Sequence, residues 1–186
     1  MKYVFLVLAL LSLTGCTSTG YLWYQEPTAG PKARVRFVTT SKGSTDLRVY
    51  DDANCTQNGT VWMDLSERSR FGGQLKKLGM PLWNYHENAA KEVYVAANKP
   101  IYGMFFGHEY MGSTTYVCAV PFSFTFSENA DYEVKYQGGA TMCSVSIAQI
   151  LRAGNNWSLT EVGKFDNKMN DSNRGCLMNQ VILLRR

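Results

Sequence analysis

The sequence lacks most of the groups on which metal and nucleophile chemistry depends. Its only two histidines, His86 and His108, each precede a glutamate, but neither has the second histidine four residues later that the helical zinc motif requires. No two cysteines have the close spacing of a zinc-binding pair. The G-x-S-x-G nucleophile motif is absent, and the glycine- and lysine-containing segment 72–79 lacks the ending of a phosphate loop. We therefore predict a protein that is not an enzyme and has no cofactor and no metal site.

The chain also lacks a strong charge of either sign. Its formal net charge is +4, and the basic residues are dispersed instead of forming a patch. Nucleic-acid binding proteins concentrate lysine and arginine on one face or along one element. We therefore expect no nucleic acid among the partners.

Only one long apolar run is present, and it lies at the start of the chain. The run from Tyr3 to Leu13 follows the basic Lys2 and is interrupted only by Ser12. It is shorter than the roughly 20 apolar residues of a membrane-spanning helix, but it fits the apolar region of a secretory signal peptide. Residues 1–15 are therefore predicted to be a signal peptide.

The run ends in Leu13-Thr14-Gly15-Cys16. These four residues resemble the lipobox of bacterial lipoproteins, in which the cysteine is acylated and becomes the first residue of the mature chain. The resemblance implies that Cys16 attaches the protein to a membrane. It also implies an outer-membrane location, because Thr17 replaces the aspartate that favours retention in the inner membrane. Residues 16–32, which contain two prolines, are expected to be the lipidated tether; their aromatic run 21–24 is expected either at the lipid headgroups or against the domain.

Four cysteines follow the lipidation site: Cys55, Cys118, Cys143 and Cys176. An even number in an exported chain predicts disulfides. Four cysteines allow three pairings. Proximity along the chain favours Cys55–Cys118 together with Cys143–Cys176.

From residue 33 to the end, the pattern predicts one domain of short β-strands. In 33–40, Ala33, Val35 and Phe37 alternate with arginines, and 44–52 repeats the alternation, so these two segments are expected to form a hairpin. β patterning returns in 91–97, 99–107, 114–126, 130–139 and 141–151, with Pro121 marking a bulge or an edge strand. Seven or more such strands predict an all-β antiparallel sandwich or barrel.

Two segments lack a regular period. Residues 56–91 are rich in glycine and are expected to be a long irregular insertion. Within it, Asp64-Leu65-Ser66-Glu67 resembles a capping box and predicts a short helix, and a strand is expected around Thr60 to Met63. Residues 154–175 are expected to be a loop interrupted by at most one short strand, and 176–184 is predicted to close a sheet.

The stretch from Ala33 to Ile150 resembles small, mostly uncharacterised proteobacterial lipoproteins. The resemblance rests on "ARVRF" in the first strand, "GMP", "EVYVAANKP" and "FSFTFSENADYEVKYQ" followed by "CSVSI". It implies an immunoglobulin-like or transthyretin-like sandwich over residues 33–186. These motifs are structural, so the resemblance transfers no functional residue.

Of the four tryptophans, Trp62 and Trp83 lie in the irregular insertion, where binding loops are common. They are our candidate binding surface; the alternative is that they fill the core beneath the insertion. We predict a non-catalytic protein-interaction module or an accessory subunit of an envelope complex. Two alternatives remain: an inhibitor of lysozyme or another envelope-directed enzyme, and a glycan- or peptidoglycan-binding module with an open groove lined by tryptophan or acidic side chains.

Overall fold

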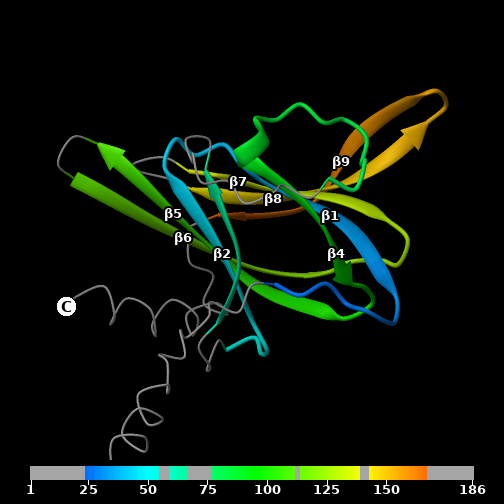
Figure 1. Ribbon diagram of the computed structural model, residues 1–186, viewed down its shortest axis with the longest axis horizontal. Coiled ribbons are helices and arrows are strands. Elements are labelled where there is room, and N and C mark those ends of the chain that lie inside the picture. The colour runs from blue at the N-terminus through cyan, green and yellow to red at the C-terminus, as the bar shows by residue number, and fades with distance from the viewer. Residues whose placement is uncertain (1–23, 55–58, 67–76, 112–113, 139–142, 167–186) are drawn as a thin grey trace, which may run out of the picture.

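The protein is a sandwich of two β-sheets (Figure 1), seen in a computed structural model that describes residues 24–54, 59–66, 77–111, 114–138 and 143–166. Sheet A has five strands in the order β4-β1-β7-β8-β9, and sheet B has four in the order β3-β2-β5-β6. The strands of sheet A are β4 (Ala90–Ala96), β1 (Lys32–Thr39), β7 (Asp131–Gln137), β8 (Ser144–Ala153) and β9 (Asn156–Asp166). Those of sheet B are β3 (Thr60–Ser66), β2 (Ser44–Tyr50), β5 (Pro100–Met111) and β6 (Thr114–Thr125).

The predicted all-β sandwich is confirmed. The described residues contain no α-helix, and the 3-10 turn η1 (Glu87–Ala89) precedes β4. All neighbouring strands pair antiparallel except β1 and β7, which are parallel. Pro121 lies on β6, an edge strand of sheet B, as its missing N–H requires.

The predicted hairpin between the first two strands is wrong. β1 belongs to sheet A and β2 to sheet B, so the intervening turn carries the chain from one sheet to the other. A hydrogen bond of 2.8 Å between the buried hydroxyls of Thr39 and Thr45 joins the two ends of this turn. Alternation predicts that a strand has one buried face, but it does not identify the neighbouring strand. Phe37 and Leu47 therefore reach the same core from opposite sheets.

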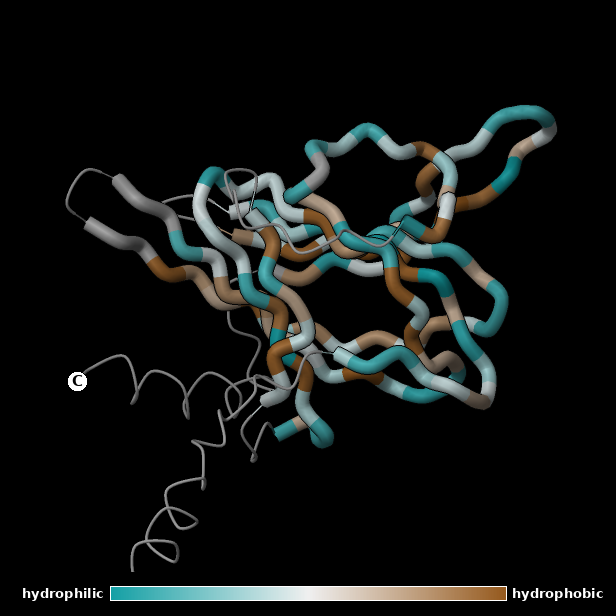
Figure 2. Tube along the Cα trace, in the orientation of Figure 1, coloured by the Kyte–Doolittle hydropathy of each residue, from teal (hydrophilic) through white to brown (hydrophobic). Residues whose placement is uncertain are grey.

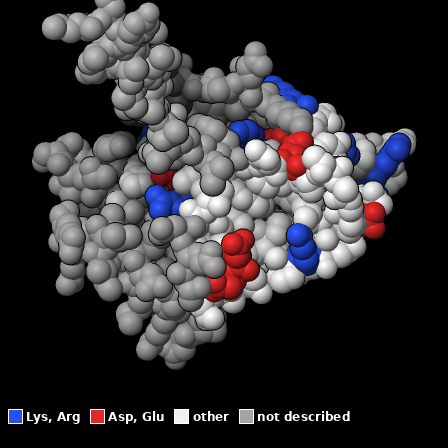
Figure 3. Space-filling model, turned by 60° about the horizontal axis from the view of Figure 1, so that its bottom comes forward, with Lys and Arg blue, Asp and Glu red and all other residues white. Residues whose placement is uncertain are grey.

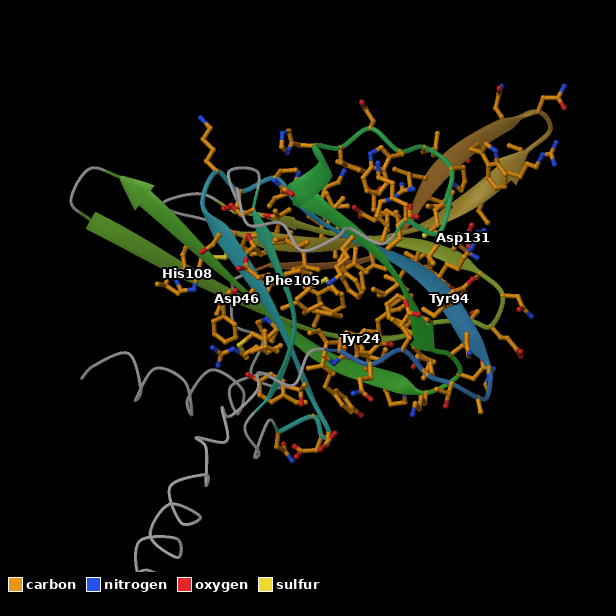
Figure 4. The ribbon with its side chains drawn as sticks, in the orientation of Figure 1. Tyr24, Asp46, Tyr94, Phe105, His108 and Asp131 are labelled. Atoms are coloured by element: carbon orange, nitrogen blue, oxygen red, sulfur yellow. A yellow bond between two sulfur atoms is a disulfide. The ribbon has the colours of Figure 1, made fainter. Side chains whose placement is uncertain are left out.

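The core lies between the two sheets, and apolar positions alternate with polar ones along most strands (Figure 2). Strand β5 differs, because Met104 and Phe106 form a second small buried cluster with Tyr50. Phe105 of β5 is completely buried at its centre (Figure 4). Its ring stacks against Phe122 on the neighbouring strand and against Tyr136 of sheet A, each with ring centroids 5.6 Å apart. The inward positions predicted for Val93 and Val95 are confirmed.

A disulfide connects the two sheets. Cys118 of β6 is bonded to Cys143, which immediately precedes β8, and their Cα atoms are 6.2 Å apart. The pairing favoured by proximity, Cys55–Cys118 with Cys143–Cys176, is therefore wrong. Proximity along the chain fails because the sandwich brings β6 and the start of β8 together from opposite sheets. Cys55 and Cys176 lie outside the described residues.

Two expectations about irregular segments also need correction. The residues Asp64 to Ser66 of the apparent capping box belong to β3, which confirms the strand expected around Thr60 but extends it in place of a helix. Residues 156–166, expected to be mostly loop, form the eleven-residue strand β9. It follows a two-residue turn in which Gly154 has a φ of 63°. The strand predicted at 176–184 lies outside the described residues.

Candidate functional site

A buried ion network lies on the outer face of sheet A. Arg36 of β1 was expected on a polar strand face, yet its side chain is completely buried. Its guanidinium donates to Oε1 of Glu92 from Nε at 3.1 Å and from Nη2 at 2.8 Å, and Nη1 donates to Glu133 at 3.3 Å. The two glutamates lie on β4 and β7, the neighbours of β1 on either side, at positions directly opposite Arg36.

The network also holds the segment that covers it, residues 77–86, which we call the strap. Arg36 donates to three consecutive strap carbonyls, those of Met80, Pro81 and Leu82, at 2.8–3.3 Å. The backbone N–H of Leu78 donates to the second carboxylate oxygen of Glu92. These side-chain hydrogen bonds, instead of pairing between strands, attach the strap to the sheet.

Trp83 completes this attachment. Its ring lies 5.3 Å from the guanidinium carbon of Arg36 and 4.3 Å from the Lys77 ammonium, so it is held between two cations. Tyr85 donates a 2.6 Å hydrogen bond to Glu133, and burial together with this hydrogen bond raises the pKa of its hydroxyl. Trp83 is half-buried in this arrangement, and its role as a binding residue stays a prediction. The polar groups of the network form hydrogen bonds and ion pairs with one another, so the network is better suited to a structural role than to catalysis.

Trp62, the other candidate, lies at the edge of the core beside the N-terminal segment. The rings of Tyr24 and Trp62 have centroids 4.0 Å apart, and the Tyr24 hydroxyl donates to the Tyr94 carbonyl of β4. Part of the predicted tether therefore packs on the domain, which is the second of the two arrangements expected for the aromatic run and is seen for Tyr24; residues 21–23 lie outside the described residues. The two rings border an open cleft of about 380 Å³ that also includes Pro100 and Ile101.

A second open cleft, of about 410 Å³, lies on the outer face of sheet A near the start of β1. We call it the Arg34 cleft. Among its lining residues, Arg34 makes a two-pronged ion pair, at 2.7 and 2.6 Å, with Asp131, which is labelled in Figure 4. Lys32 and Glu128 add one further charge of each sign, and Tyr94 contributes a ring. This is a polar cleft with balanced charge.

The two histidines lie on different elements. His86 is exposed beside η1, whereas His108 is half-buried on β5. Nε2 of His108 lies 3.8 Å from an Asp46 carboxylate oxygen (Figure 4). Burial raises the pKa of Asp46, and the His108 and Arg48 charges oppose this shift. Among the residues that the structure describes, no group of three or more histidine, cysteine or acidic side chains is arranged to hold a metal ion.

The most exposed apolar surface lies on a hairpin that sequence reasoning assigned to a loop. Strand β7 pairs with β8 only as far as Ile150, so β8 and β9 continue beyond the sandwich as a two-stranded ribbon (Figure 1). The ribbon consists of residues 151–158, and we call it, together with the adjoining residues 159–162 at the edge of sheet A, the arm. Every residue in it is exposed, and apolar positions recur along it (Figure 2).

Four large apolar side chains of the arm are 40–44% exposed: Leu151, Trp157, Leu159 and Val162. The described residues include only two others of this kind, Leu82 and Val117. Trp157 lies near the arm's tip, with the guanidinium carbon of Arg152 5.9 Å from its ring. The alternation of 157 and 159 with polar residues could have identified this strand, but the surrounding asparagines and glycines obscured it.

Among the described residues on the face drawn in Figure 3, small acidic and basic groups lie apart between uncharged residues. Within the described segments, no helix is long and apolar enough to cross a membrane. Comparisons of the chain with protein-family models, with curated proteins and with solved structures find no match.

Proposed function

We propose that this chain is a lipid-anchored envelope protein that binds another protein without catalysis, and that the arm is its docking surface. The lipobox-like sequence supports attachment through Cys16 to the outer membrane. The role of the chain is then that of an accessory subunit, or of an interaction module held near the membrane.

The concentration of exposed apolar side chains on the arm carries this proposal. Water-exposed apolar residues scattered singly are ordinary, but a group of them on one projecting element is typical of an interaction site. Tryptophan and leucine on a ribbon also offer a large contact area to a partner, and tryptophan is prominent among residues that dominate binding energy.

Photocrosslinking in cells tests the proposal. A photoreactive residue is placed at Trp157 in the full-length chain, and at Val117 of β6 as a control with nearly equal exposure. We expect one dominant protein to be captured from position 157 and not from 117, and the purified partner to bind a Trp157→Ser variant more weakly. Equal capture from both positions, or unchanged binding by the variant, would contradict an interface on the arm.

The anchor has its own test. Cys16→Ala should leave the protein unprocessed or released from membranes, whereas the unaltered chain should sediment with the outer-membrane fraction. A variant that still partitions like the wild type would refute the lipobox interpretation.

The Arg34 cleft favours glycan binding as a second candidate function. It is open and contains the acidic side chains Glu128 and Asp131, together with the amide of Asn129 and the ring of Tyr94. Such planar polar groups can exchange hydrogen bonds with vicinal hydroxyls. Titration with oligomers of N-acetylglucosamine tests this candidate: binding should be lost in Asn129→Ala, and the absence of binding at millimolar concentration would exclude it.

A further inference from the structure

We propose that the free edge of β9 takes up an extended segment of the partner protein as an additional strand of sheet A. This inference rests on the proposed function and specifies how the arm recognises its partner. The occupant is a protein segment in β conformation that alternates apolar with polar residues and has low net charge. Its main-chain groups pair with those of β9.

The edge of β4, at the other side of sheet A, is already occupied. The N–H of Tyr94 donates to the Glu26 side chain at 3.1 Å, and its carbonyl accepts from Tyr24. Just after the strand, Ala97 N–H donates to the Pro31 carbonyl at 2.9 Å. The N-terminal segment thus covers this edge at Tyr94 and satisfies both main-chain groups of that residue.

The two edges of sheet B are interrupted by features that hinder strand addition. On β6, Pro121 has no N–H to offer. On β3, the register shifts so that Val61 and Met63 pair with consecutive residues of β2, which leaves Trp62 as a bulge packed on the core. Proline and bulges are devices by which natural sheets protect their edges from pairing.

Within the described part of the chain, the outer segment of β9 has no such protection. Residues 156–161 pair one-for-one with β8, contain no proline, and the first register shift comes only after Glu161. Among the described residues, no hydrogen bond reaches this edge from another element. As far as the described residues show, β9 is therefore the sheet edge that presents an uninterrupted, regular row of main-chain groups without a partner.

The turn geometry identifies which main-chain groups face outward. Gly154 and Asn155 form a two-residue turn between the paired residues Ala153 and Asn156, and the positive φ at Gly154 matches a type II′ hairpin. The pair that closes such a turn is hydrogen-bonded, and bonded and non-bonded pairs alternate along an antiparallel ladder. The N–H and C=O groups of Trp157, Leu159 and Glu161 therefore point to the free edge.

The chemistry of the arm defines the partner segment. Trp157 and Leu159 share one face of the ribbon, and Ser158 and Thr160 share the other, so a matching strand places apolar residues on the first face. Arg152 and Glu161 bring one charge of each sign. A strongly acidic or basic segment would set a like charge against one of them, which is why the partner strand has low net charge.

The marginal stability of the two-stranded part of the arm favours the addition of a third strand. A two-stranded ribbon is marginally stable in water, and a third strand is normally needed to stabilise it. Both faces of the arm are exposed beyond Ile150. A partner strand would satisfy the outward main-chain groups and cover part of the apolar face in the same step, which is how strand-addition domains bind extended peptides.

The test uses the full-length chain purified in detergent and a synthetic nine-residue peptide that alternates threonine with valine between a terminal lysine and a terminal glutamate. Its twin, N-methylated at every residue, keeps the side chains but has no N–H to donate. The matched protein variants are Leu159→Ala, which removes the side chain, and Leu159→Pro, which also removes the outward N–H without affecting the bonds to β8. Binding is followed by isothermal titration calorimetry.

We expect saturable binding of the peptide, no binding of the twin, and affinity at least about tenfold weaker for Leu159→Pro than for Leu159→Ala, as the loss of a main-chain pair implies. Equal binding of peptide and twin, or no binding of either, overturns strand addition without involving any variant that could misfold. Equal affinities of the two variants, or self-association of the chain that excludes the peptide, overturn it as well. Crosslinking from Trp157 that persists in Leu159→Pro cells would leave the proposed function standing while strand addition fails; loss of all capture from the arm would remove both.

Discussion

Replacing Arg36 by methionine should be among the most destabilising single changes in the described part of the chain. Arg36→Met keeps much of the side chain's length but removes every hydrogen bond of the guanidinium. Glu92 and Glu133, whose side chains are 1% and 2% exposed, would then remain as buried carboxylates that have lost their shared cation. Three strap carbonyls would lose their donor in the same step.

The expected cost is about 3–5 kcal/mol in the free energy of unfolding, which is typical of breaking a buried ion pair by removing one partner. Two interactions reduce the damage around Glu133, because Tyr85 still donates to it and Lys135 lies 3.3 Å away. Among the residues that the structure describes, no such substitute lies near Glu92, which otherwise accepts only from backbone N–H groups of the strap. We therefore expect the strap to loosen at its Glu92 side first.

Urea denaturation at neutral pH measures the effect, with Arg34→Met as the matched control on the same strand. The Arg34 side chain is 36% exposed, so breaking its ion pair with Asp131 should cost about 1 kcal/mol or less. The triple change Arg36→Met, Glu92→Gln, Glu133→Gln should recover part of the loss, because no buried charge is then left without its partner. A cost below about 1 kcal/mol for Arg36→Met alone would refute the view that this arginine holds the strap.

Three further predictions concern the sandwich itself. Removing the Cys118–Cys143 bridge by double substitution to alanine should cost about 3.5 kcal/mol, given a sequence separation of 25, and peptide mapping under non-reducing conditions should recover the two cysteines joined. Burial raises the pKa of Asp46, so the native state binds the carboxyl proton more tightly than the unfolded state does. The resulting stabilisation is complete at pH values below the ordinary pKa of 3.8 and is lost as the pH rises through the higher pKa of the folded state. Asp46→Asn should therefore reduce the loss of stability between pH 4 and pH 7, and equal urea midpoint shifts for both proteins would contradict this. Gly107→Ala would place a Cβ 2.6 Å from a ring carbon of the buried Tyr136, so a loss of about 1–3 kcal/mol is expected on thermal unfolding, and an unchanged melting temperature would show that the ring can move aside.

The alternation of apolar residues was sufficient to predict the fold class and most strands. Phe37, Leu47, Val93 and Val134 all occupy inward positions of period-two segments and all lie in the common core. The pattern carries this information because one buried face per strand is the defining requirement of a sandwich. The pattern carries no information about which strands are neighbours. The wrong hairpin and the wrong disulfide pairing both follow from the assumption that segments close in sequence pair with one another.

The candidate sites were harder to predict because their residues act against their usual preferences. The alternation in β1 predicts that Arg36 faces solvent, because arginine is seldom fully buried unless it is paired. Its burial depends on Glu92 and Glu133, which also occupy the outward positions of their strands and meet it only when β4 and β7 flank β1. Trp157 is the reverse case, a large apolar side chain left in water. The exposure of both residues therefore depends on tertiary neighbours: such neighbours bury Arg36, and none among the described residues buries Trp157.

The N-terminal segment and the arm lie at opposite edges of sheet A, so the proposed anchor and the proposed docking surface are separated. Tyr24 contacts the β4 edge, whereas β9 forms the far edge four strand spacings away, about 19 Å at the usual distance between strands. Tyr24 lies eight positions after Cys16, a reach of at most about 29 Å in a fully extended chain. A domain lipidated at Cys16 would thus be held close to the membrane through one edge of the sheet while the other edge stays accessible. Strand addition at β9 would then extend sheet A away from the tether, so that anchoring and partner binding need not compete for the same main-chain groups.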